Sequence, residues 1–243
     1  MKPKPQVLEV WGDFACFSRP ELKVERFSYP LITPSAARGI FDAIYCKPNR
    51  ESTQAQFRWQ VTNIELLTPV AYIALRRNEV GSVASVANIK QWMKGTSPPQ
   101  PLIIEEAQQR QTMALKNVRY LLTAEIRPFP GHENKQQALE AQFIRRATHG
   151  KCFHHPYFGC REFPAYFEYV EPGKGKATPL NYTQDLGMML YDVFDLRTPN
   201  NSHAPPFISL FRAEIRRGVL EIPPFESEKV LKPELAGRRI PNA

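Results

Sequence analysis

Residues 33–45, TPSAARGIFDAIY, predict the helix around which the first part of the fold is arranged. Thr33 is a residue type that caps helices, and Pro34 fits the first helical position, where a missing N–H group costs nothing. Apolar side chains then recur at helical spacing, at Ala37, Ile40, Phe41, Ile44 and Tyr45. The sequence therefore predicts one amphipathic helix that ends before the lysine–proline pair at 47–48.

Strand-like segments surround this helix. Residues 7–17 precede it, and Gly12 within them indicates a bulge or a close backbone approach. After the helix, three segments are predicted to be strands, at 57–67, 70–77 and 111–126, and apolar and polar residues alternate within the first and the last of them, at 57–61 and 118–126. A short helix is expected over 86–94, between the last two of these segments. The order strand, helix, strand, strand, helix, strand is the βαββαβ pattern of ferredoxin-like folds, which include RNA-recognition modules.

A second region begins near residue 130. Its first element is a helix that ends at Gly150, predicted from the apolar stripe of Leu139, Phe143, Ile144 and Ala147. Strand-like segments follow at 152–170, 187–196, 207–215 and 219–222. We therefore predict an α+β protein with two parts. An RRM-like, ferredoxin-like domain covers residues 1–128, and a second domain over residues 129–243 holds a helix, a small antiparallel β-sheet and a loosely held C-terminal tail.

The composition is that of an ordinary globular protein, with 42% hydrophobic residues in 243. There is no apolar run of 18 residues, and the N-terminal residues lack the apolar core of a signal peptide, so we expect a cytoplasmic protein with no membrane partner. The four cysteines form no C-x-x-C pair and are expected to be reduced thiols. We expect no metal site and no cofactor.

The charge balance gives the first hint of a ligand. The chain has 32 Lys and Arg against 24 Asp and Glu, a formal net charge of +8, and most of the excess lies in residues 1–121. A basic surface favours polyanions, because binding them releases condensed counterions. Nucleic acid is one interpretation of this charge, and solubility alone is the other.

A long run near the N-terminus carries a more specific signal. Residues 11–45 read WGDFACFSRPELKVERFSYPLITPSAARGIFDAIY. Three later segments go with it: RRNE at 76–79, RQT at 110–112 and YFGCREF at 157–163. Together they resemble the Cas-five family of CRISPR-associated proteins of type I-C (Dvulg) systems. The resemblance follows the chain in order over nearly its whole length.

This resemblance implies a fold and an activity. The family belongs to the repeat-associated (RAMP) superfamily and has an N-terminal ferredoxin-like domain followed by a small antiparallel β domain. Its members are metal-independent endoribonucleases that cut precursor CRISPR RNA at the 3′ base of the repeat hairpin. The resemblance also implies that the protein keeps the 5′ handle of the product RNA inside a multi-subunit surveillance complex, and that the other subunits of this complex are its partners.

The resemblance further implies three catalytic positions: Tyr45, Lys116 and Asn117. The RNA 2′-OH attacks the neighbouring phosphate in such a reaction, so the enzyme has to move protons and stabilise negative charge. Tyr45 needs a neighbouring cation to lower its pKa before it can act as a base. Asn117 stands where the family pattern has His, and an amide does not transfer protons in the physiological range. A replacement imidazole would come from His149, His154 or His155.

Basic side chains spread along the chain are the predicted RNA contacts. They are Arg19, Lys23, Arg26, Arg38, Arg76, Arg77, Arg110, Arg145, Arg146, Lys151 and Arg161. Because Asn117 departs from the family pattern, a second hypothesis stays open, in which the protein is a non-catalytic subunit that binds the handle of the CRISPR RNA. Binding of double-stranded DNA is a third hypothesis, which rests on charge alone.

Overall fold

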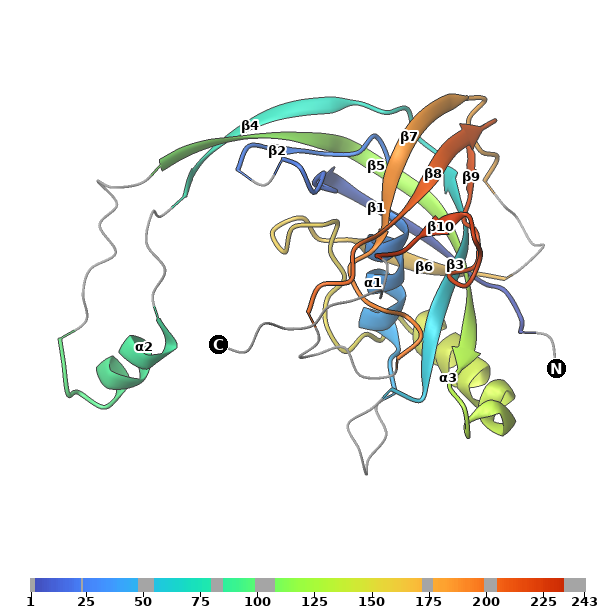
Figure 1. The fold of residues 1–243 in the computed structure, drawn as a ribbon, viewed down its shortest axis with the longest axis horizontal. Helices are drawn as coiled ribbons and strands as arrows, with labels where there is room; N and C mark the ends of the chain where they lie inside the picture. Colours follow the sequence, from blue (N-terminus) through green and yellow to red (C-terminus); the bar gives the residue numbers. More distant parts are fainter. Residues whose placement is uncertain are drawn as a thin grey trace.

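The computed structural model describes residues 3–22, 24–47, 55–79, 85–98, 108–171, 177–198 and 205–233 (Figure 1). The first half contains β1 (Gln6–Ala15), β2 (Arg26–Phe27), α1 (Pro34–Ile44), β3 (Phe57–Leu66), β4 (Tyr72–Glu79), α2 (Val86–Met93) and β5 (Gln108–Pro128). The second half contains a 3₁₀ turn (Glu133–Lys135), α3 (Gln136–Thr148), β6 (Tyr166–Val170), β7 (Gln184–Asp192), β8 (Ser209–Arg216), β9 (Val219–Glu221) and β10 (Val230–Leu231).

The strands form one sheet in the order β10-β8-β9-β3-β5-β1-β6. In addition, β2 and β4 pair with β5, and β7 pairs with β8. Pairing is antiparallel throughout the described strands except between β2 and β5. This mostly antiparallel sheet with few helices confirms the predicted α+β class.

The βαββαβ unit uses different elements from those we expected. The strands β6, β1, β5 and β3 lie side by side, and the two helices that pack with them are α1 and α3. The expected second helix, α2, buries none of its residues and lies apart from the sheet in Figure 1. It is inserted together with β4 between β3 and β5. A helix without a buried face cannot complete a layer, whereas α3 buries Leu139, Phe143 and Ala147.

The sheet therefore continues across the boundary that we expected between residues 128 and 129. Strand β6 pairs with β1, and β9 pairs with β3, so elements from both predicted domains share one sheet. The βαββαβ unit closes at Val170, where β6 ends.

An aromatic cluster joins α1 and α3 to the sheet. The ring centroid of Phe41 in α1 lies 4.8 Å from that of Trp59 in β3 and 5.7 Å from that of Phe143 in α3. Trp59 and Phe143 are 4.6 Å apart. All three side chains are at most 1% exposed, so the contact fixes both helices relative to β3.

Helix α1 begins and ends as its sequence predicts. The Thr33 hydroxyl accepts a hydrogen bond from the Ala36 N–H at 3.2 Å, and Pro34 is the first helical residue. After Ile44 the chain becomes extended at Tyr45, whose carbonyl oxygen accepts a hydrogen bond from Trp59 Nε1 at 3.0 Å. The end of α1 is thus attached to β3.

Most of the segment 152–165, which we predicted to be strand, is a loop with turns that precedes β6. This loop lies against β1, and the close approach predicted at Gly12 is confirmed. A Cβ atom at Gly12 would come within 2.7 Å of the Pro164 carbonyl oxygen and 2.9 Å of the Phe158 ring.

Candidate functional site

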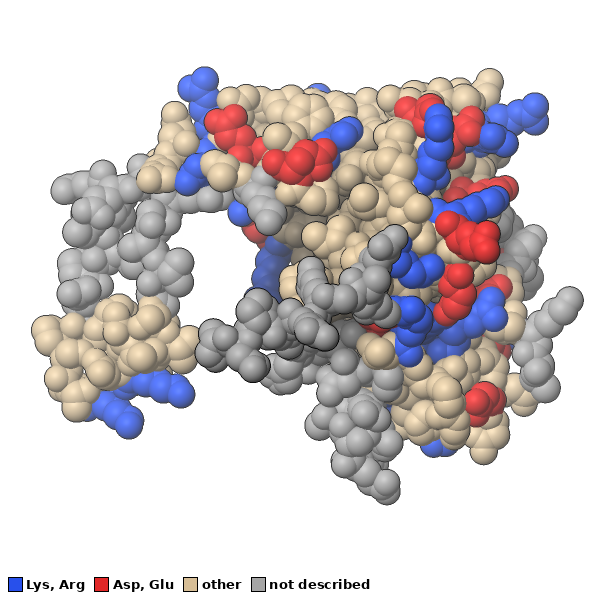
Figure 2. Space-filling model, in the orientation of Figure 1, with Lys and Arg blue, Asp and Glu red and all other residues tan. Residues whose placement is uncertain are grey.

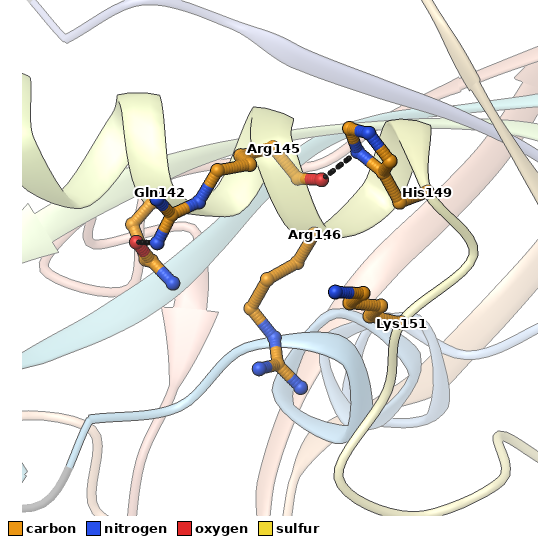
Figure 3. Close-up of a pocket in the computed structure, with 5 residues that line it drawn as sticks. All are labelled: Gln142, Arg145, Arg146, His149 and Lys151. Atoms are coloured by element: carbon orange, nitrogen blue, oxygen red, sulfur yellow. Dashed lines mark hydrogen bonds between the residues drawn. The ribbon is translucent and has the colours of Figure 1, made fainter.

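A hollow of about 320 Å³ lies at the C-terminal end of α3 (Figure 3). Its lining is Gln142, Arg145, Arg146, His149 and Lys151. Among the described residues, those that line it include three cationic side chains and no carboxylate. The structure therefore brings together three of the predicted RNA contacts, Arg145, Arg146 and Lys151. We call these five residues the α3 cluster.

Arg146 holds the α3 cluster against the end of α1. Its Nε donates a hydrogen bond to the Ile44 carbonyl oxygen at 2.7 Å, and its guanidinium carbon lies 4.1 Å from the centre of the Phe153 ring. Its side chain therefore has a structural role in addition to its charge. Arg145 is exposed and hydrogen-bonds to Gln142, so its position depends less on the core.

His149 is oriented by the backbone of α3. Its Nδ1 lies 2.7 Å from the Arg145 carbonyl oxygen, the contact drawn as a dashed line in Figure 3. A carbonyl oxygen only accepts hydrogen bonds, so Nδ1 carries a hydrogen. In the neutral ring, Nε2 then holds the lone pair and is the atom that can take up a proton.

Tyr45 lies beside the α3 cluster. Its ring packs 5.3 Å from that of Phe57, and the residue is 4% exposed. Burial raises the pKa of Tyr45, and the positive charges of Arg146 and Arg145 only partly oppose this. A base at this position needs a lowered pKa, but desolvation outweighs the two cations. The Tyr45 hydroxyl is therefore suited to donate a hydrogen bond, and it is a poor base.

Lys116 and Asn117 lie elsewhere on the sheet. Lys116 is exposed on β5 opposite Phe14 of β1, and the Asn117 carbonyl accepts a hydrogen bond from the Thr68 hydroxyl at 3.0 Å. Phe57, the neighbour of Tyr45, pairs with Pro128 at the far end of β5. Pro128 comes twelve positions after Lys116, which is about 40 Å along the strand β5. The structure therefore does not bring Lys116 and Asn117 together with Tyr45.

A second group of predicted RNA contacts lies where β4 and β2 flank the start of β5. Arg77 pairs with Arg110 across the β4–β5 ladder, and Arg76 is the next residue of β4. Arg26 pairs with Thr112 on the other side of β5. Arg77 also forms an ion pair with Glu162 and lies 4.8 Å from the centre of the Phe163 ring.

Two further predicted contacts, Arg19 and Arg38, are not gathered with either group. Arg19 lies 4.8 Å above the Tyr29 ring and 3.8 Å from Glu21, and Lys23 falls outside the described residues. Arg38 donates from Nε and Nη2 to the two oxygens of Asp192, at 2.7 and 3.2 Å, and from Nη1 to Asp42. Its charge is therefore balanced by two carboxylates, so Arg38 is a poor phosphate ligand.

A larger groove of about 970 Å³ opens between α1 and the loop that follows α3. Arg161, the last predicted contact, lines it together with His154, His155 and Tyr157. Residues of the loop 149–161 thus line both the hollow of the α3 cluster and this groove. Sequence analysis missed Asp42, which also lines the groove, although its i,i+4 spacing from Arg38 is the signal that predicts their ion pair.

The exposed face of β7–β9 is electrostatically unfavourable for a polyanion. Figure 2 shows basic and acidic side chains interleaved over β7–β9. Two ion pairs on this face, Arg212 with Asp185 and Arg216 with Glu214, each have N–O distances of 2.7 Å. Opposite charges at such spacing largely cancel the field felt by a ligand.

No group of three or more His, Cys, Asp and Glu side chains in the described ranges is arranged to hold a metal ion. Within the same ranges, none of the helices has the length and apolar character needed to cross a membrane.

Comparison with known proteins identifies the family. The family described as "CRISPR-associated protein (Cas_Cas5)" matches residues 7–223. A protein of Mannheimia succiniciproducens named "CRISPR pre-crRNA endoribonuclease Cas5d" is 39% identical over 92% of this chain and 96% of its own length. A protein of Thermus thermophilus with the same name is 38% identical over 89% of this chain and 90% of its own length.

Solved structures share the fold. A structure described as a CRISPR-associated protein superposes with a TM-score of 0.63 at 17% identity, covering 94% of this chain and 97% of its own. A functionally uncharacterized protein from Streptococcus mutans gives a TM-score of 0.60 at 19% identity, with the same coverage. Because the family match covers most of the sequence and both relatives align along nearly their whole length, the chain belongs to the Cas5 family of CRISPR-associated proteins.

Proposed function

We propose that this protein is an endoribonuclease that cleaves precursor CRISPR RNA within its repeat. The observation that carries the proposal is the α3 cluster, in which Arg145, Arg146 and Lys151 line one hollow with His149, beside Tyr45. Cations bind and stabilise the phosphate, and an imidazole transfers the proton, so the cluster contains the groups that RNA cleavage requires. The two relatives named as pre-crRNA endoribonucleases support the same reaction.

The chemistry that suits these residues is attack by the RNA 2′-OH. His149 Nε2 takes the 2′-OH proton, the 2′-oxygen bonds to phosphorus, and the bond from phosphorus to the 5′-oxygen breaks. Arg145 stabilises the additional negative charge, and Lys151 protonates the leaving 5′-oxygen. The products are a 2′,3′-cyclic phosphate and a free 5′-OH. Mg²⁺ prefers carboxylate oxygens, whereas the cluster offers nitrogen donors and cations, which favours a metal-independent reaction.

The handle of the product RNA has a second set of candidate contacts. Arg26, Arg77 and Arg110 lie on one face of β2, β4 and β5, and Arg76 lies next to Arg77 on the opposite face. A backbone that runs from the α3 cluster past Arg161 toward these residues would remain bound after cleavage. We propose that the protein keeps the handle in this way as a subunit of a CRISPR surveillance complex.

The second candidate function is binding of the same RNA without cleavage. Two observations on the residues for which the family resemblance implies catalysis favour this candidate. Tyr45 is deeply buried, and it lies far from Lys116. Binding of double-stranded DNA is the least specific candidate, and it predicts a steep salt dependence without preference for the repeat.

The deciding experiment incubates the purified protein with RNA of the cognate repeat in the presence of EDTA. The proposal predicts one cut, with a 2′,3′-cyclic phosphate on the upstream fragment by mass spectrometry. A gel-shift assay on the same RNA measures binding independently of cleavage. Tight binding of the repeat without any cut would establish the second candidate and reject the nuclease. Equal binding of repeat RNA and unrelated duplex DNA would reject both.

A further inference from the structure

The groove beside α1 carries an acceptor that the cleavage chemistry does not use. It lies between α1, residues 154–161 and the chain after β7, and its volume of about 970 Å³ is at the upper end of the range for ligand pockets. Asp42 lines it from α1, and Phe194 and Tyr157 line it from the two other walls. The inference drawn from this groove rests on the proposed function, since it assumes that the ligand is RNA.

Asp42 is held in place from one side only. Arg38 donates to its Oδ2, and Arg38 is itself fixed by two hydrogen bonds to the buried Asp192. None of the described residues donates a hydrogen bond to the other carboxylate oxygen, Oδ1, and the Asp42 side chain is 36% exposed. The carboxylate is therefore oriented by the fold and still able to accept hydrogen bonds from a ligand.

The carboxylate is also costly to leave without a donor. Desolvation raises the pKa of Asp42, with a smaller contribution from the negative charge of Asp192, although Arg38 opposes both effects. A ligand that brings N–H groups to Asp42 supplies donors to a carboxylate that has lost part of its hydration.

Two aromatic side chains stand exposed beside this acceptor. Tyr157 is 43% exposed and Phe194 is 40% exposed, and the Arg38 guanidinium lies 5.7 Å from the centre of the Phe194 ring. Unpaired RNA bases stack on such rings. Arg161 lines the same groove and can meet a phosphate of the same nucleotide.

We propose that this groove binds an unpaired nucleobase of the substrate RNA and that Asp42 selects guanine. A carboxylate only accepts hydrogen bonds, and guanine presents two adjacent donors, N1–H and the N2 amino group, on one edge. Uracil presents a single N–H between two carbonyl oxygens, which the carboxylate repels. The aromatic rings stack on the face of the base, and Asp42 accepts hydrogen bonds from its edge.

The test titrates the intact protein with guanosine, inosine and uridine 5′-monophosphates, observed by ligand-detected NMR up to millimolar concentrations. The wild type is expected to bind the guanosine nucleotide about tenfold more tightly than the uridine nucleotide. Inosine lacks the amino group and should bind with intermediate affinity. Asp42→Asn should abolish the preference, because the amide presents donors as well as an acceptor, while Arg38 keeps its contacts with Asp192.

Asp185→Asn is the matched control, since Asp185 is an exposed carboxylate on β7 that pairs with Arg212 and does not line the groove. It should keep the preference for guanosine. Equal affinity of the three nucleotides for the wild type, or an unchanged preference in Asp42→Asn with a native melting profile, would overturn the inference. If the protein cleaves the repeat but shows no preference for guanosine, the proposed guanine site is rejected and the proposed nuclease is not. If the protein prefers guanosine but does not cleave the repeat, only the proposed nuclease activity is rejected.

Discussion

The Arg146 side chain of α3 donates a hydrogen bond from Nε to the carbonyl oxygen of Ile44 in α1 at 2.7 Å. The two residues are 102 positions apart in the sequence. This carbonyl belongs to the last residue of α1, immediately before Tyr45. Helix ends leave carbonyl groups without an intrahelical partner, and a cation is a favourable donor there. The contact joins the ends of α1 and α3 and places Tyr45 beside the α3 cluster.

The first prediction separates the structural role of Arg146 from the electrostatic role of Arg145. Arg146→Ala should lower the free energy of unfolding by about 2 kcal/mol, because it removes a charged hydrogen bond and the contact with Phe153. Arg145→Ala should leave stability nearly unchanged. Both variants should weaken binding of repeat RNA and reduce its salt dependence. Urea denaturation and gel-shift titrations at two salt concentrations measure these effects, and a destabilised Arg145→Ala would contradict the assignment.

The second prediction concerns the buried ion pair under the groove. Asp192 accepts two hydrogen bonds from Arg38 and further ones from the backbone N–H groups of Val193 and Phe194. Asp192→Asn removes one of the two carboxylates that balance Arg38 and should cost about 3–5 kcal/mol in thermal or chemical unfolding. Asp185→Asn breaks an exposed pair with Arg212 and should change stability little. Similar stabilities for the two variants would argue against this ion network.

The third prediction tests how the loop after α3 lies against β1. Gly159 has a φ of +80°, and a Cβ atom there would overlap the Cys16 carbonyl oxygen. Gly159→Ala should therefore cost about 3 kcal/mol or more and weaken RNA binding, because the same loop lines both hollows. Gly131 has a φ of +86° but open space around it, so Gly131→Ala should cost only about 1 kcal/mol. Equal costs for the two variants would mean that the loop does not pack closely on β1.

The fourth prediction is a pH dependence. A hydrogen bond with Cys160 lowers the pKa of Cys16 to about 6, assisted by Ser18 and the charge of Arg26, although burial opposes this. A thiol with a lowered pKa stabilises the fold above its ordinary pKa of about 9 and loses that contribution as the pH falls through about 6. The stability difference between wild type and Cys160→Ala should therefore be larger at pH 8 than at pH 5. Cys152→Ala is the control, and a difference that does not vary with pH would contradict the thiol pairing.

The parts of the fold that the sequence predicts are those with strong local signals. Helix α1 has a capping residue, a proline at its first position and a continuous apolar stripe, and all three act within thirteen residues. The second helix of the βαββαβ unit was assigned to α2 because spacing alone cannot distinguish an exposed amphipathic helix from a packed one. Only the contacts of Phe143 with Phe41 and Trp59 identify α3 as the packed helix.

Only part of the arrangement of the candidate site residues follows from the sequence, for a related reason. Arg145, Arg146 and Lys151 lie within seven residues at one helix end, so their proximity is local. The distance between Tyr45 and Lys116 depends on the register between β3, on which Tyr45 packs, and the 21-residue strand that contains Lys116, and no local pattern encodes that register. The ion pair between Arg38 and Asp192 could not be predicted either, because the two residues are 154 positions apart in the sequence.

The most direct test of this account is the single-turnover rate of repeat cleavage in EDTA by His149→Gln and by Lys116→Ala, with Arg216→Ala on β8 as the control. We predict that His149→Gln slows cleavage at least about a hundredfold with repeat binding retained, since general acid–base catalysis is removed. Lys116→Ala and the control should cleave at nearly the wild-type rate. Loss of cleavage in Lys116→Ala together with a normal rate in His149→Gln would place the reaction on β5 and contradict the assignment of catalysis to the α3 cluster.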